Sequence, residues 1–141
     1  MEKQLIYAYT AGLIDGEGTI TLTKTHSSNE FRYPVISITS TTYSFLSYMK
    51  EQFGGTISTH KSYSDKHKVS WHWTLVGSKV ISLLPNIIPY MLEPNKIYRA
   101  KLIIDQYSAL TPRNGKYTDK MRENKHKFEY DFFHPSNTID F

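Results

Sequence analysis

The stretch "TAGLIDGEG", Thr10 to Gly18, places three glycines and two carboxylates at the end of an apolar run. Apolar residues before and within it recur at three- and four-residue steps, which predicts a helix. Glycine is a poor helix former, so the last two glycines are expected to end that helix. Small residues on its contact face, Ala8, Ala11 and Gly12, would let another backbone approach closely. That backbone could belong to the protein's own sheet or to a second chain.

One carboxylate of this stretch, Glu17, lies between Gly16 and Gly18. A carboxylate is a hard oxygen ligand suited to Mg²⁺ or Ca²⁺. Flanking glycines let the backbone come close to a phosphate or to a partner chain. The plainer interpretation is a polar turn. A dinucleotide-binding loop is excluded, because its glycines precede a helix whereas these end one.

Length and composition indicate one folded domain. The chain has 141 residues, of which 39% are hydrophobic and 14% aromatic. It has no cysteine, which excludes disulfides and thiolate metal sites. No apolar stretch approaches the roughly 20 residues that span a bilayer, and "MEKQLIYAY" is not typical of a signal peptide, so we expect an intracellular protein without membrane contact. A net charge of +4 permits nucleic acid as a partner without requiring it.

The rest of the chain predicts two pairs of strands, with a helix between them and two helices after them. The strands are expected at 19–26, 32–40, 56–64 and 68–76, and the helices at 41–55, 77–91 and 94–110. Pro85 and Pro89 are expected to break the helix at 77–91. The tail from 111 onward is first basic, then aromatic and acidic.

The predicted strands alternate between an apolar face and a face of Thr, Ser, His and Lys. The simpler interpretation is that the polar face is the solvated outer face of an antiparallel sheet. Short hydroxyl side chains are also suited to reading DNA in the major groove, where they can donate and accept hydrogen bonds at base edges. Composition alone leaves both interpretations open.

The nine-residue stretch resembles the LAGLIDADG signature of homing endonucleases, with Thr10, Gly16 and Glu17 replacing Leu, Ala and Asp. The segments 45–58 and 87–104 and the order of elements also match that family. The resemblance implies an α+β fold: an αββαββα homing-endonuclease core at 1–110 with an antiparallel, saddle-shaped DNA-binding sheet. A C-terminal extension at 111–141 would follow as a helical tail.

A chain with a single signature is expected to act as a homodimer. The resemblance then implies a site-specific double-strand DNA homing endonuclease that acts in intron homing on a long pseudo-palindromic site. The residues it assigns to the dimer interface are Ala8, Ala11, Gly12 and Asp15.

The resemblance also implies the catalytic residues. The last acid of the signature, Glu17, would bind Mg²⁺ together with its copy in the partner, and Ca²⁺ or Mn²⁺ are expected to substitute. A Lys-x-x-Gln-Ala pattern of the family reads Lys96, Arg99, Ala100 here, which implies that Lys96 supports catalysis. A glutamine of the active-site water network is replaced by Ser40, a departure from the family's pattern.

Strand alternation predicts which side chains contact DNA. The residues are Thr21, Thr23, Thr25, Lys24, Arg32, Tyr33, Ser37, Ser58, His60, Lys61, Lys66, Lys68, Ser70, His72 and Thr74. The lysines among them are expected to contact phosphates, which positions the protein without reading sequence. Basic residues of the tail, Lys116, Lys120, Arg122, Lys125 and Lys127, are predicted to extend that phosphate-binding surface.

Two other functions fit the same resemblance. Some family members are maturases that bind intron RNA, so RNA is a possible partner. Others bind DNA after losing cleavage, although the intact Glu17 argues against this. The sequence does not distinguish a bacterial, phage or organellar source.

Overall fold

The computed structural model describes residues 2–60 and 69–135. The elements are α1 (Lys3–Glu17), β1 (Gly18–Thr23), β2 (Tyr33–Ser40), α2 (Tyr43–Phe53), β3 (Thr56–His60), β4 (Ser70–Val76), α3 (Ser78–Ile87), η1 (Ile88–Tyr90), α4 (Pro94–Leu102), η2 (Ile103–Tyr107) and α5 (Asp119–Phe133). This order confirms the predicted α+β class with an αββαββα core and a C-terminal helix. Three predicted DNA contacts, Lys61, Lys66 and Lys68, lie outside the described residues.

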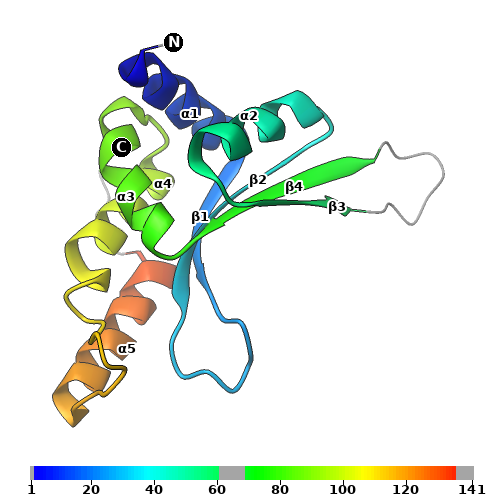
Figure 1. Cartoon of the computed structure of the whole chain (residues 1–141). Helices are drawn as coiled ribbons and strands as arrows, with labels where there is room; N and C mark the ends of the chain where they lie inside the picture. Colours follow the sequence, from blue (N-terminus) through cyan, green and yellow to red (C-terminus); the bar gives the residue numbers. More distant parts are fainter. Residues whose placement is uncertain (1, 61–68, 136–141) are drawn as a thin grey trace.

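The four strands form one antiparallel sheet in the order β1-β2-β4-β3. Helices α1 to α4 pack on one face of it, and the other face is open (Figure 1). Strand alternation sends the apolar side chains toward the helices, where Ile38 and Trp73 are fully buried opposite each other. The Trp73 indole is fixed by its Nε1–H, which donates to the Gly54 carbonyl at 2.8 Å.

Helix α1 runs one residue past Gly16, so the expectation that Gly16 ends it is wrong. Gly18 does end it: its N–H donates to the Ile14 carbonyl, and a Cβ there would lie 2.8 Å from Ile14 Cα. Only glycine lets β1 leave the helix this abruptly. Tertiary packing outweighs the cost of about 1 kcal/mol for each helical glycine.

Helix α3 contains Pro85, which was expected to break it. A proline removes one backbone hydrogen bond, but here the buried side chains of Val80, Leu84 and Ile87 hold the helix against the sheet. The α-helix ends at Ile87, but Pro89 does not break the helical path, because Ile88 keeps αR dihedral angles and the chain continues into the 3-10 turn η1.

The segment expected as one helix at 94–110 is instead α4 continued by the wider π-turn of η2. Helix α5 then returns to α4, and its Phe128 and Phe132 join the same buried core as the sheet. No helix in the described part of the chain is long and apolar enough to span a membrane.

Candidate active site and nucleic-acid interface

Glu17 is the last residue of α1 and is exposed at the start of the sheet. Within residues 2–60 and 69–135 its carboxylate has no hydrogen-bond or ion-pair partner. An acid at a helix C-terminus faces the negative end of the dipole, at a cost of about 0.3–1 kcal/mol. The fold alone gives no reason for this carboxylate, whereas a bound cation would stabilise it.

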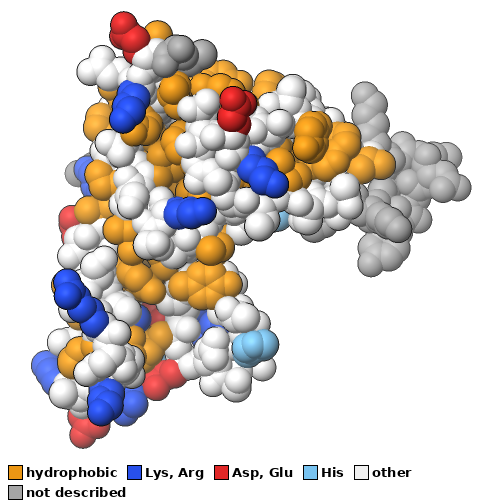
Figure 2. Space-filling model, in the orientation of Figure 1, with side chains coloured by type: hydrophobic (Ala, Val, Ile, Leu, Met, Phe, Trp, Pro, Cys, Tyr) orange, Lys and Arg blue, Asp and Glu red, His pale blue; other side chains and the backbone are white. Residues whose placement is uncertain are grey.

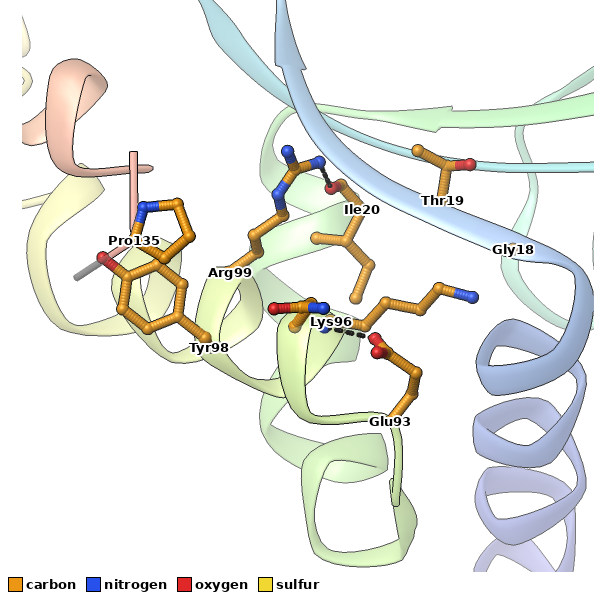
Figure 3. Close-up of a pocket in the computed structure, with 9 residues that line it drawn as sticks. Gly18, Thr19, Ile20, Glu93, Lys96, Tyr98, Arg99 and Pro135 are labelled. Atoms are coloured by element: carbon orange, nitrogen blue, oxygen red, sulfur yellow. Dashed lines mark hydrogen bonds between the residues drawn. The ribbon is translucent and has the colours of Figure 1, made fainter. Parts of the chain in front are cut away.

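Lys96 reaches the same end of α1 from the first turn of α4. Its Nζ donates to the carbonyls of Ile14 and Asp15 at 2.9 and 2.8 Å. Figure 3 shows the side chain extending toward the end of the helix near Gly18. The Glu93 carboxylate caps α4 by accepting from the Lys96 N–H at 2.7 Å. Lys96 and Glu17 are thus brought to one helix terminus, as their predicted joint role requires.

Asp15 joins the end of α1 to the segment just before α4. Its carboxylate accepts hydrogen bonds from the N–H groups of Leu92 at 2.8 Å and Glu93 at 3.2 Å. These hydrogen bonds give the acid a structural role within its own chain, and its assignment to the dimer interface stays a prediction. Ala11, in contrast, is not available to a partner, because it is fully buried in the protomer's core.

The exposed face of α1 is apolar and carries two glycines. Leu5 and Tyr9 are 57% and 44% exposed. A Cβ added at Gly12 or Gly16 would meet no atom within 4 Å, and neither glycine has a positive φ. The protomer itself therefore requires glycine at neither position. A shallow groove of about 520 Å³ follows this face and is lined by Ala8, Tyr9, Gly12, Leu13, Gly16, Glu17 and Phe45.

Ser40 ends β2 at the α1 end of the sheet, since Gly18 pairs with Ile38 two residues earlier. Its hydroxyl accepts a hydrogen bond from the Thr42 N–H at 3.0 Å, which shapes the turn into α2. Its local role is thus structural, and its catalytic role stays a prediction.

The open face of the sheet carries the predicted strand residues in rows that run across the strands. One row is Thr19, Ser37, Thr74 and Thr56, and another is Thr39, His72 and Ser58. The face is completed by Thr21 with Val35 and Val76, by Thr23 with Tyr33, and by Ser70. The side chain of His60, also predicted to contact DNA, lies outside the described part of the chain. Figure 2 shows the molecule hollowed between the β1–β2 loop and the β3–β4 strands. Local alternation did not reveal that Thr39 Oγ1 and His72 Nδ1 would be hydrogen-bonded at 2.6 Å.

Some basic residues predicted to contact DNA have partners within the chain. The Arg32 guanidinium pairs with Glu129 at 2.7 Å, and Arg122 Nε pairs with Glu30 at 2.8 Å. Lys125 is only 2% exposed. Lys125 is therefore not available to DNA, and Arg32 would have to give up a buried carboxylate partner to reach it. Arg122, Lys116, Lys120 and Lys127 are exposed, and the ion pairs of Arg122, Lys120 and Lys127 lie at the surface. Lys24 and Thr25 lie in the loop after β1.

A cleft of about 500 Å³ lies between β1 and α4 (Figure 3). Arg99 crosses it to donate from Nη1 to the Ile20 carbonyl at 2.9 Å, and its guanidinium lies 4.9 Å from the centre of the Phe132 ring. Arg99, the second member of the Lys-x-x-Arg-Ala pattern, thus joins α4 to β1 and to α5.

A sequence model of the LAGLIDADG endonucleases matches residues 10–107, from the signature helix through both strand pairs to η2. The chain belongs to the LAGLIDADG endonuclease family. This is a family of metal-dependent DNA endonucleases. No curated protein sequence matches the chain significantly.

Solved LAGLIDADG structures share the fold over nearly the whole chain. The homing endonuclease I-CvuI, in complex with its target in the presence of Ca, is 17% identical with a TM-score of 0.71, and the match covers 99% of this chain and 88% of that one. The archaeal intron-encoded homing endonuclease I-Vdi141I, complexed with DNA, is 18% identical with a TM-score of 0.62, covering 97% and 87%. The LAGLIDADG homing endonuclease I-GzeII, in complex with a DNA target, is 16% identical with a TM-score of 0.65. That match covers 96% of this chain but only 46% of the I-GzeII chain.

Proposed function

We propose that this protein is a homodimeric, metal-dependent homing endonuclease that cuts both strands of a long pseudo-palindromic DNA site. The observation that carries the proposal is the unpartnered Glu17 carboxylate. It stands where the glycine-bearing face of α1 meets the open, hydroxyl-lined face of the sheet. The similarity to DNA-bound homing endonucleases supports DNA as the substrate.

The dimer would form through the exposed face of α1. The described residues of one chain contain no cluster of three or more His, Asp or Glu able to hold a metal ion. A two-fold axis along the groove would bring a second Glu17 beside the first, because the groove ends at that residue. The same axis would set two open sheets end to end, which suits a pseudo-palindromic site.

The paired Glu17 carboxylates would hold Mg²⁺, with Ca²⁺ or Mn²⁺ as substitutes, since hard oxygen donors suit these ions. When bound, the metal would activate a water and stabilise the leaving oxygen of the phosphodiester. Glu17 is well suited to this position because it ends a helix whose C-terminal dipole already favours a cation. Lys96 would hold the end of α1 in place and keep a positive charge close to the scissile phosphate.

The sheet would lie in the major groove and present its hydroxyl rows to base edges. The rows contain no acidic side chain that would repel phosphates. Exposed lysines at the edges of the surface would contact the backbone, which predicts binding that weakens steeply as salt is raised.

The experiment is cleavage of a randomised DNA library in Mg²⁺ by the wild type, by Glu17→Gln, and by the control Glu51→Gln on the exposed surface of α2. The proposal expects double-strand cuts at one sequence class by the wild type and the control, and none by Glu17→Gln. Selective binding without any cut by the wild type would instead indicate a DNA-binding protein that has lost cleavage.

A further inference from the structure

Helix α5 carries a buried lysine that the proposed chemistry does not use. Lys125 is 2% exposed, and its Nζ donates to the hydroxyls of Thr111 at 2.8 Å and Tyr117 at 2.7 Å. The rings of Phe31, Tyr107 and Tyr117 surround it at 4.8–5.2 Å. Burial lowers the pKa of this ammonium from its ordinary value. Burying a charge without a directly paired carboxylate is costly. The contacts that Lys125 makes between α5, the segment before it and the β1–β2 loop must offset that cost.

The next turn of α5 holds the end of the β1–β2 loop. The Glu129 carboxylate, 7% exposed, accepts from the Arg32 backbone N–H at 3.0 Å and from its Nη1 at 2.7 Å. The Arg32 guanidinium also lies 5.3 Å from the centre of the Phe133 ring. A buried carboxylate with two donors from one residue fixes both the backbone and the side chain at that point.

The two residues before Arg32 are also bound to α5. Glu30 accepts from Arg122 Nε at 2.8 Å and is 3.0 Å from His126 Nε2. The Phe31 ring packs against Tyr117 at 4.8 Å and His126 at 4.7 Å. Three consecutive residues of the loop are therefore clamped by one helix, which runs alongside the base of the loop in Figure 1.

The rest of the loop is exposed and is presented from this clamped base. Residues 25–29 are exposed, and they include Thr25 and His26. The loop lies at the far end of β1 from Glu17, and the six residues of β1 span about 20 Å at roughly 3.3 Å each. At 3.4 Å per base pair, the start of the loop would lie about six base pairs from the centre of the DNA site, and the loop tip would lie farther out.

We propose that α5 is a brace that holds the β1–β2 loop in register with the DNA, and so sets base discrimination at positions about six or more base pairs from the centre of the site. This inference rests on the proposed function. Glu129 and Lys125 are positioning residues in it, since they act on DNA only through the loop. It gives the C-terminal helix a role in specificity in addition to any phosphate contacts of its exposed lysines.

The test compares Glu129→Gln with Glu123→Gln, the same change on the exposed side of the same helix, where the side chain is 73% exposed. Both variants remove one negative charge, so the effect of net charge on DNA affinity is the same in both and drops out of the comparison. Tyr117→Phe, which removes only the hydroxyl that accepts from Lys125, is a milder second variant. Circular dichroism checks folding. Backbone hydrogen exchange of residues 24–32 and selection from a randomised half-site library are then measured.

The brace predicts exchange in the loop about tenfold faster in Glu129→Gln, a smaller increase in Tyr117→Phe, and no change in Glu123→Gln. Base preference should relax at the outer positions and persist at the inner ones. If the wild type selects a site and Glu129→Gln and Glu123→Gln show the same base preference at the outer positions, the brace is overturned and the proposed function stands. A wild type that selects no sequence would overturn the proposed function, and the reading role of the loop with it.

Discussion

Replacing Gly12 with alanine is expected to have opposite effects on the protomer and on the dimer. Within the protomer the new Cβ would meet no atom within 4 Å, and the residue lies in a helix. Alanine is favoured over glycine in a helix interior by about 0.5–1 kcal/mol. The isolated protomer should therefore become more stable by about that amount.

At a closely packed helix pair the same methyl group would push the backbones apart. Overpacking costs about 1–3 kcal/mol per site, and the two-fold axis makes two sites per dimer, or about 2–6 kcal/mol. Each 1.4 kcal/mol is tenfold in affinity, so the dimer dissociation constant should rise by about thirtyfold or more.

Sedimentation velocity over a range of protein concentrations measures the dimer, and urea unfolding at the lowest concentrations measures the protomer. Asn124→Ala on the exposed surface of α5 is the control, because it raises helix propensity away from α1. An unchanged dissociation constant in Gly12→Ala would refute the proposed interface. A Gly12→Ala monomer that is less stable than the wild type would contradict the finding that a Cβ at this position meets no other atom.

Three further predictions concern the stability of the fold. Lys96→Met removes the ammonium that holds the last carbonyls of α1, so the free energy of unfolding in urea should fall by about 1.5–3 kcal/mol. Gly55→Ala should lower the melting temperature in calorimetry by about 5 °C or more, because φ is +87° and the added Cβ would lie 2.5 Å from the Thr74 carbonyl oxygen. The pKa of Lys125 is lowered below 10.5 by burial, so the unfolded chain binds more protons in the window beneath that value and stability should rise with pH there. Lys125→Met should flatten this rise in urea unfolding series, and the raised pKa of Tyr107 should make both proteins less stable above pH 10.0.

The strand faces could be predicted from the sequence because burial of one face forces a period of two, and Ile20 alternating with Thr19 and Thr21 fixes the register. The partners of the basic residues Arg32 and Lys125 could not be predicted from the sequence. Arg32 meets its carboxylate 97 positions away, and no local pattern shows such a contact. Lys125 likewise has the spacing of a solvated helix residue and becomes buried only because aromatic rings from three other segments surround it.

The two acids of the opening stretch differ through helix geometry. Residues two apart on an α-helix point about 200° away from each other, so Asp15 and Glu17 cannot share a surface. Asp15 accepts hydrogen bonds from the N–H groups of Leu92 and Glu93 just before α4, which places Lys96 at the carbonyls of the same turn of α1. Glu17 is left on the open side without a partner in the described protomer. The first acid therefore builds the terminus from which the second is presented. In the library cleavage assay, Asp15→Asn should impair the proposed cleavage by displacing Lys96, although Asp15 is not a proposed metal ligand.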